Sequence, residues 1–262
     1  QCNQCGVQRL REKDCIPDKY YETGEYRDKL KESLNGDKAV IEQDKMQHFT
    51  LRTLFPSSLR GKTILDVGCG IGSLLDMLKN VSHRQIGIEP CSPYLESLSE
   101  RGYEVYPNIF DAEKYYRNSI DYGFSIQVIE HVESPREFLE GIKKLIKPGG
   151  RVLISTPNRN DILMTLLKKE FFPFFYRTQH RWYFDKSSLT ICAEQAGFKV
   201  DNVKFVHRYG MSNTIAWLRD KKPTGFNKLP GIAMTADNLW STYLEQSEQS
   251  DCLYIELILP TN

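Results

Sequence analysis

The stretch Ile64-Leu65-Asp66-Val67-Gly68-Cys69-Gly70-Ile71-Gly72-Ser73 carries the strongest structural signal in this chain. An aliphatic run leads into three alternating glycines, and a helical pattern begins near Leu74. Glycine permits a positive φ and lets the backbone approach a ligand closely. In open α/β sheets, ligands bind beyond the carboxyl ends of the strands. The stretch therefore predicts a buried strand, a ligand-binding turn and a helix in immediate succession.

The spacing of the glycines distinguishes two kinds of ligand. A dinucleotide-binding loop has the pattern G-x-G-x-x-G. Here Gly68, Gly70 and Gly72 alternate, and Ser73 stands where that pattern needs its third glycine. Asp66, at the end of the strand, would repel a phosphate but suits a cationic amino group. The loop favours a nucleoside-type cofactor without phosphate, and a dinucleotide-dependent oxidoreductase is the alternative.

Short apolar runs alternate with helical windows on both sides of this loop. The predicted strands are Thr63–Val67, Arg84–Ile88, Glu104–Tyr106, Tyr122–Ile126, Arg151–Ser155, Phe198–Val206 and Cys252–Leu259. The predicted helices are Leu74–Asn80, Ser92–Arg101, Pro135–Ile146 and Lys186–Ala196. Such alternation indicates a parallel sheet covered on both faces, and right-handed crossovers make it doubly wound. We therefore predict an α/β fold.

Composition and charge narrow the class of protein. The chain has 262 residues, of which 40% are hydrophobic and 26% charged, as in ordinary globular proteins. Its net charge of +1 argues against nucleic acid or an anionic membrane as a partner. No apolar run approaches the length of a membrane span, and no signal peptide is visible. Seven scattered cysteines favour a reducing cytosol. We expect a cytoplasmic protein that acts on a small molecule.

Five segments, in order, resemble the motifs of class I S-adenosylmethionine-dependent methyltransferases. They are Leu65–Gly72, Gly87–Glu89, Phe110–Glu113, Tyr122–Val132 and Leu145–Gly150. The resemblance covers about residues 60–160 and continues more weakly to Val206. It implies a mostly parallel, seven-stranded Rossmann-like sheet with helices on both faces, and S-adenosylmethionine as the cofactor.

The same resemblance assigns cofactor-binding residues. It implies that Glu89 binds the ribose hydroxyls and that Asp111 receives the adenine amino group. Either carboxylate could instead be a helix N-cap or a solvated loop residue, and Asp111 follows a poor strand. The expected set is Asp66, Gly68, Cys69, Gly70, Gly72, Glu89, Pro90, Asp111, Ala112 and Gln127.

Three residues are candidates for catalysis. His131 follows the fourth strand, where the methyl group should lie, and a histidine suits proton abstraction near neutral pH. His131 could instead pack on the next helix, and Glu130 is similarly placed. His180 follows an aromatic cluster, in a connection roughly 25 residues longer than usual. We expect this insertion, near 158–184, to cover the acceptor, although it could be an extra helix with an aromatic core face. His207 and Arg208 could also line the acceptor site.

The sequence predicts three parts along the chain. Residues 1–19 form a Cys-containing head, 20–60 a helical cap and 61–262 the methyltransferase domain, ending in an irregular tail from 207. Cys2-Asn3-Gln4-Cys5-Gly6 resembles half of a zinc ribbon that precedes some of these enzymes. A structural zinc needs four ligands, and only Cys15 is near, so no metal is expected in this chain.

The sequence indicates the identity of the methyl acceptor less clearly than any other feature. Ser155–Asn160 resembles ubiquinone-biosynthesis O-methyltransferases, whereas Arg208–Asn213 is similar to methyltransferases of bacterial surface-glycan clusters. We favour transfer to a hydroxyl of a sugar or glycan precursor. The alternatives are a phenolic or quinone-precursor acceptor, and a non-catalytic cofactor-binding protein. The sequence does not indicate an oligomeric state.

Overall fold

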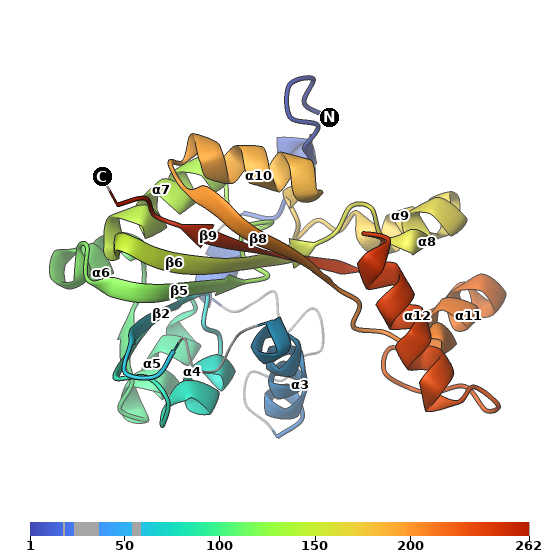
Figure 1. The fold of residues 1–262 in the computed structure, drawn as a ribbon, viewed down its shortest axis with the longest axis horizontal. Coiled ribbons are helices and arrows are strands. Elements are labelled where there is room, and N and C mark those ends of the chain that lie inside the picture. Colours follow the sequence, from blue (N-terminus) through green and yellow to red (C-terminus); the bar gives the residue numbers. More distant parts are fainter. Residues whose placement is uncertain (18, 24–36, 54–58, 262) are drawn as a thin grey trace.

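A seven-stranded mixed sheet forms the centre of the computed structural model, which describes residues 1–17, 19–23, 37–53 and 59–261 (Figure 1). The strand order is β4-β3-β2-β5-β6-β9-β8. The strands are β2 (Thr63–Val67), β3 (Arg84–Ile88), β4 (Glu104–Tyr106), β5 (Ile120–Ile126), β6 (Ile146–Pro157), β8 (Lys199–Val206) and β9 (Cys252–Ile258). All neighbours pair in parallel except β9, which runs antiparallel to both β6 and β8. The predicted mostly parallel, doubly wound sheet is confirmed.

Helices cover both faces of this sheet. The helices of the described residues are α1 (Lys19–Thr23), α3 (Asp37–Thr53), α4 (Ser73–Leu78), α5 (Ser92–Glu100), α6 (Ile109–Tyr116), α7 (Pro135–Leu145), α8 (Ile162–Leu166), α9 (Lys168–Phe175), α10 (Lys186–Gln195), α11 (Met211–Asp220) and α12 (Met234–Gln246), not all of which lie on the sheet. The helices α7 and α10 lie on one face, and α3, α4 and α5 on the other (Figure 1).

The sequence explains why α7 forms and where it packs. The Ser134 side chain caps its N-terminus by accepting from the Glu137 N–H, and Pro135 opens its first turn. Leu139, Ile142 and Leu145 recur at helical spacing and are fully buried against the sheet. The four helices expected from the sequence all form within two residues of their predicted ends.

The predicted third strand is β4, and Asn108 caps α6 just after it, so Phe110 and Asp111 lie in the first turn of that helix. One expectation about local structure was wrong. The tail from residue 207 is not irregular, since it contains α11 and α12 before β9. Neither helix has a side-chain N-cap, so no capping residue in the sequence marks where it starts. Both helices contribute buried residues, Trp217 and Leu244, to a shared cluster with the insertion.

The insertion near 158–184 forms α8 and α9, which extend beyond the sheet beside α11 and α12 (Figure 1). Phe171 and Phe175 of α9 are buried in that cluster. The strand β1 (Gln8–Arg9) of the head pairs with β7 (Trp182–Tyr183) at the end of the insertion. Residues 24–36 and 54–58 of the expected helical cap lie outside the described residues. No described helix is both long enough and apolar enough to cross a bilayer.

Candidate functional site

The glycine turn between β2 and α4 requires glycine for two reasons. Gly68, Gly70 and Gly72 have φ values of 77°, 57° and 88°. A Cβ on Gly68 would lie 2.4 Å from Val128 Cγ2, and one on Gly72 would lie 2.6 Å from Leu98 Cδ2. Both the backbone conformation and the available space therefore exclude side chains here. The turn lies at the carboxyl edge of the sheet, where the sequence places a cofactor.

Glu89 joins the end of β3 to this turn. Its Oε2 accepts a hydrogen bond from the Gly70 N–H at 2.8 Å, and its Oε1 accepts from the Cys91 N–H at 2.9 Å. The side chain is buried, while the following Pro90 is exposed. Cys69 is buried beneath the turn, and burial raises the pKa of its thiol. The arrangement holds a carboxylate beside the glycine turn, as the ribose-binding expectation requires.

Asp66 lies beside Glu89 at the same edge. It is buried within β2, opposite Gly87 in the parallel register. Burial, and secondarily the nearby Glu89 charge, raises the pKa of Asp66 to about 7. A cationic group bound next to Asp66 would stabilise its ionised form. The structure thus brings together two carboxyl groups that the sequence predicted for the cofactor.

Asp111 is placed differently from the other predicted cofactor residues. It lies in the first turn of α6, where its N–H donates to the Asn108 side chain at 2.9 Å. Its carboxylate accepts from Lys114 at 2.6 Å and from the Asn108 amide at 2.9 Å, and these bonds lower its pKa. Ala112 is fully buried in the core. The contacts of Asp111 match the helix-terminus alternative, and its role toward adenine stays a prediction.

Gln127 lies between the glycine turn and the interior of the site. It is one of four described non-glycine residues with positive φ, at 58°. Its Nε2 donates to Ser155 Oγ and contacts Cys252 Sγ, both at 3.2 Å. The next residue, Val128, is the one that occupies the space above Gly68. Just after β5, Val128 therefore contacts the glycine turn, and Gln127 lines a cavity that is described below.

His131 is held in one tautomer by its neighbours. Its Nδ1 lies 2.7 Å from the Gln179 carbonyl oxygen and 2.9 Å from the Tyr21 hydroxyl. A carbonyl oxygen only accepts, so Nδ1 carries the proton and donates to Gln179. The unprotonated Nε2 is on the side of Glu130, 3.9 Å from its Oε1. The two contacts at Nδ1 therefore fix the orientation of the His131 ring.

Glu130 and His180 complete this cluster. Glu130 is buried, accepts from Thr156 Oγ1 at 3.1 Å, and has its pKa raised to about 8 by burial. The His180 ring lies edge-on to His131, with centroids 4.8 Å apart, and burial lowers its pKa well below the usual value. The three donor atoms lie within 4.8 Å of one another, so the group could hold a metal ion as well as move a proton.

A cavity of about 380 Å³ opens next to this cluster. His180 and Gln127 line it, and residues of the insertion and of α11 form much of its wall. Its aromatic lining residues are Phe171, Phe174, Phe175, Tyr209 and Trp217. Its polar lining residues are Gln127, Asp161, Arg177, His180, His207, Arg208, Asn213, Thr214 and Asp251. Glu130 and His131 lie behind the lining.

Several of these lining residues were not predicted from the sequence. Asn213 and Trp217 lie one turn apart on α11, a helix that was not predicted from the sequence. Asp251 precedes β9 and reaches the cavity only because β9 inserts between β6 and β8. By contrast, the cavity does include His207 and Arg208, which the sequence proposed as possible acceptor-site residues.

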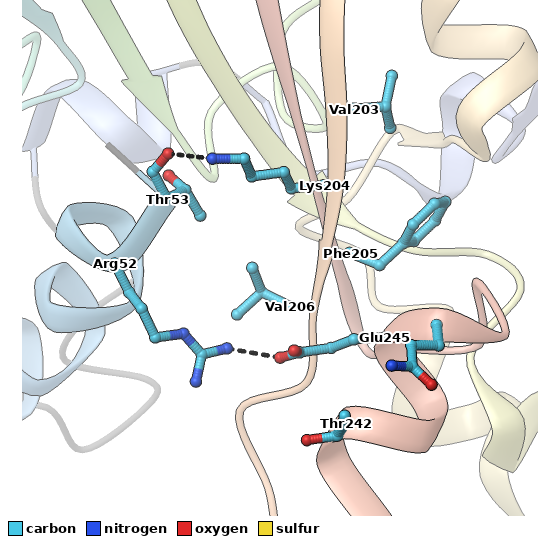
Figure 2. Close-up of a pocket in the computed structure, with 9 residues that line it drawn as sticks. Arg52, Thr53, Val203, Lys204, Phe205, Val206, Thr242 and Glu245 are labelled. Atoms are coloured by element: carbon cyan, nitrogen blue, oxygen red, sulfur yellow. Dashed lines mark hydrogen bonds and ion pairs between the residues drawn. The ribbon is translucent and has the colours of Figure 1, made fainter. Parts of the chain in front are cut away.

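The helix α3 links the cofactor turn to the far side of the molecule. In its second turn, Gln43 lies against the glycine turn, with its Oε1 3.1 Å from where a Cβ on Gly70 would be. At its end, Arg52 pairs with Glu245 of α12 at 2.5 Å across a second cavity, of about 410 Å³ (Figure 2). The same Glu245 oxygen accepts from the His207 N–H at 3.0 Å. One carboxylate thus connects α3 with a lining residue of the first cavity.

The head does not assemble a metal site by itself. Gly6 N–H donates to the Cys2 carbonyl, so residues 2–6 form a tight turn. Hydrogen bonds from neighbouring backbone groups lower the pKa of the Cys2 thiol. Over the described ranges, the one grouping of three potential metal ligands contains no cysteine. The zinc-ribbon expectation for Cys2, Cys5 and Cys15 stays a prediction.

Comparisons with known proteins agree with this geometry. Residues 41–203 match a family described as "Methyltransferase domain". The chain is 31% identical over 167 residues to a ubiquinone biosynthesis O-methyltransferase of Aeromonas salmonicida, covering 59% of this chain and 70% of the relative. It is 28% identical over 179 residues to the Coxiella burnetii enzyme of the same name, covering 62% of this chain and 74% of that enzyme.

Solved structures show the same fold. A SAM-dependent methyltransferase from Archaeoglobus fulgidus superposes with a TM-score of 0.57 at 16% identity, covering 90% of this chain and 98% of that chain. Haemonchus contortus phosphoethanolamine N-methyltransferase 2, solved with S-adenosyl-L-methionine, superposes with a TM-score of 0.55 at 20% identity. That match covers 90% of this chain and 60% of the other. At these identities the likeness concerns the fold alone.

Proposed function

Because this chain belongs to the family of S-adenosylmethionine-dependent methyltransferases, we propose that it methylates a phenolic hydroxyl of a small aromatic acceptor. The observation that carries the proposal is the position of Gln127 and Val128. Val128 packs on the glycine turn, and Gln127 lines an aromatic-walled cavity. An acceptor in that cavity would therefore lie next to the methyl donor. The relatives named as O-methyltransferases support oxygen as the methylated atom.

The residues around the cavity suit this reaction. The donor supplies an electrophilic methyl group on a sulfonium, so the protein must mainly orient the acceptor and remove its proton. His180 lines the cavity and stays neutral near pH 7, because burial holds its pKa well below the usual value. The neutral ring can accept the hydroxyl proton as the methyl group is transferred, although the same burial disfavours a lasting imidazolium. His131 contacts the edge of His180 and positions it, and Glu130 lies behind both.

Two carboxyl groups at the glycine turn are assigned to different parts of the cofactor. We assign the ribose hydroxyls to Glu89 and the amino group to Asp66, since both carboxyl groups lie at the glycine turn. Calorimetric titration with S-adenosylmethionine and S-adenosylhomocysteine, with NAD as the control ligand, tests this assignment. We expect binding of both sulfur compounds to be lost in Glu89→Ala and no binding of NAD. Retained affinity in that variant would remove Glu89 from the site.

A sugar hydroxyl is the second candidate acceptor. The observation that favours it is the number of hydrogen-bonding side chains around the cavity, including Asp161, Asn213 and Asp251. Aromatic walls can hold either a sugar ring or a phenol. The test is methyl transfer from radiolabelled S-adenosylmethionine to a panel of catechols and a matched panel of nucleotide sugars. Product from catechols alone supports the proposal, product from sugars alone overturns it, and cofactor binding without any product favours a non-catalytic role.

A further inference from the structure

His207 carries a buried hydrogen-bond donor whose partner is missing from the described part of the chain. The side chain is only 3% exposed, at the point where β8 leaves the sheet. Its Nδ1 accepts from the Asp251 main-chain N–H at 3.1 Å; it also lies 3.3 Å from the Asp251 carboxylate Oδ1, but that contact lacks hydrogen-bond geometry. A main-chain N–H can only donate, so Nδ1 has a lone pair and the proton of the neutral ring is on Nε2. Burial also lowers the pKa of His207, which keeps the ring neutral.

The Nε2–H is therefore a donor without a partner. Its atom is buried and makes no hydrogen bond to any described residue. Buried donors in folded proteins nearly always have a partner, and an exception calls for a functional reason. His207 lines the 380 Å³ cavity, and Nε2 lies on the ring edge away from Asp251. An acceptor molecule in the cavity can supply the missing partner.

The charges beside His207 indicate what that partner is. Arg208 lies next to it, but its main-chain N–H and its Nε both bond to the Asp251 carboxylate, at 2.7 Å and 2.5 Å. The cation of Arg208 is thus balanced by Asp251, which also orients the His207 ring through its own N–H. A neutral donor beside a balanced ion pair suits an uncharged oxygen better than a carboxylate or phosphate.

We propose that His207 Nε2–H anchors a second, uncharged oxygen of the acceptor, distinct from the oxygen that is methylated. The acceptor is then a ring with at least two oxygen substituents, one beside His180 and the other at His207. This inference rests on the proposed function, because it assumes that the cavity holds the acceptor. A site built around such a donor rejects analogues that lack the matching oxygen, because their binding leaves the donor buried and unpaired.

Two variants separate the anchor from the structural role of the ring. Asn at position 207 can keep an oxygen near the position of Nδ1, facing the Asp251 N–H, but has no donor at the position of Nε2. Gln can place its amide near the position of Nε2. Affinities for catechol and for phenol are measured by calorimetry with S-adenosylhomocysteine bound. We expect the wild type to prefer catechol by about tenfold or more, His207→Asn to lose most of that preference, and His207→Gln to retain part of it.

The outcomes also distinguish this inference from the proposed function. Unchanged S-adenosylhomocysteine affinity in both variants is the folding control. If the wild type methylates catechol but binds phenol equally well, or if His207→Asn keeps the full preference, the anchor is overturned while the function stands. If the wild type binds S-adenosylhomocysteine yet neither binds nor methylates catechol and related phenols, the phenolic function and the anchor both fail.

Discussion

Arg52 at the end of α3 and Glu245 of α12 form an ion pair 2.5 Å long that ties the helix over the cofactor turn to the acceptor side of the molecule (Figure 2). One end of this connection lies at the cofactor turn and the other at the acceptor cavity. The second turn of α3 places Gln43 against Gly70, and Glu245 also accepts from the His207 N–H. Arg52 is 54% exposed, so the pair itself contributes about 1 kcal/mol or less to folding. Its effect should instead appear in ligand affinity.

We therefore predict that Arg52→Ala weakens S-adenosylmethionine binding by a few-fold and changes the melting temperature little. Loss of the pair allows α3 to move relative to the glycine turn. Arg136→Ala is a matched control, because Arg136 pairs with Glu140 on α7 and is similarly exposed, at 61%. Titration calorimetry and thermal unfolding of both variants test this. Equal cofactor affinities in the two variants would show that the Arg52–Glu245 pair does not support the cofactor site.

Gly68 should be far less tolerant of substitution than another glycine with the same backbone conformation. Gly68→Ala combines a positive φ of 77° with a 2.4 Å approach to Val128. Gly102→Ala has a similar φ of 80° but no atom within 4 Å of the added Cβ. We expect Gly102→Ala to cost about 1 kcal/mol of unfolding free energy and Gly68→Ala about 2 kcal/mol more, with loss of cofactor binding.

Chemical denaturation measures both costs. Val128→Ala removes the contacting methyl groups, so in the Gly68→Ala background it should recover part of the lost stability. No recovery in the double variant would show that the contact with Val128 does not cause the damage.

The stability of the protein should depend on pH through Asp66. Its folded-state pKa of about 7 lies above the ordinary value of 3.8, so the folded protein binds this proton more tightly than the unfolded chain. That contribution is fully present below about pH 4 and is lost as the pH rises to about 7. We predict that the stability of the wild type, relative to Asp66→Asn, falls by about 2 to 4 kcal/mol over this range. Denaturant unfolding of both proteins at several pH values tests this, and parallel curves would contradict it.

Cofactor binding should release a proton from the same group. A cationic amino group beside Asp66 favours the carboxylate, so near pH 6 binding is accompanied by ionisation. Calorimetry in two buffers with different ionisation enthalpies measures this proton. We expect release in the wild type and much less in Asp66→Asn. Equal proton release in both proteins would place the amino group elsewhere.

His180 and the Tyr21 hydroxyl that contacts His131 should differ in their effect on turnover. We predict that His180→Ala lowers kcat by about 100-fold or more, since it removes the proton acceptor that lines the cavity. Tyr21→Phe should lower kcat only a few-fold but shift the pH profile, because Tyr21 contacts His131 and not the cavity. Cofactor affinity should stay unchanged in both variants. Full acceptor turnover by His180→Ala would exclude His180 from the mechanism.

The sequence by itself determined the sheet, the glycine turn and the family of this protein. The strands, the turn and the helices that follow them are signalled by residues close in the chain, as in Thr63–Leu78. Local period and glycine spacing are enough to predict these elements. The helices α11 and α12 were missed because neither begins with a side-chain N-cap that would mark its start.

Only the tertiary structure decided the acceptor cavity. Its lining comes from Gln127, the insertion, α11 and the residues before β9, which are separated by tens to more than a hundred positions in the chain. Asp251, 44 residues away, donates to His207 Nδ1 and so leaves the proton on Nε2, which has no hydrogen-bond partner among the described residues. Such an arrangement follows from the antiparallel insertion of β9 between β6 and β8. No local pattern encodes it, because its physical cause is long-range strand pairing.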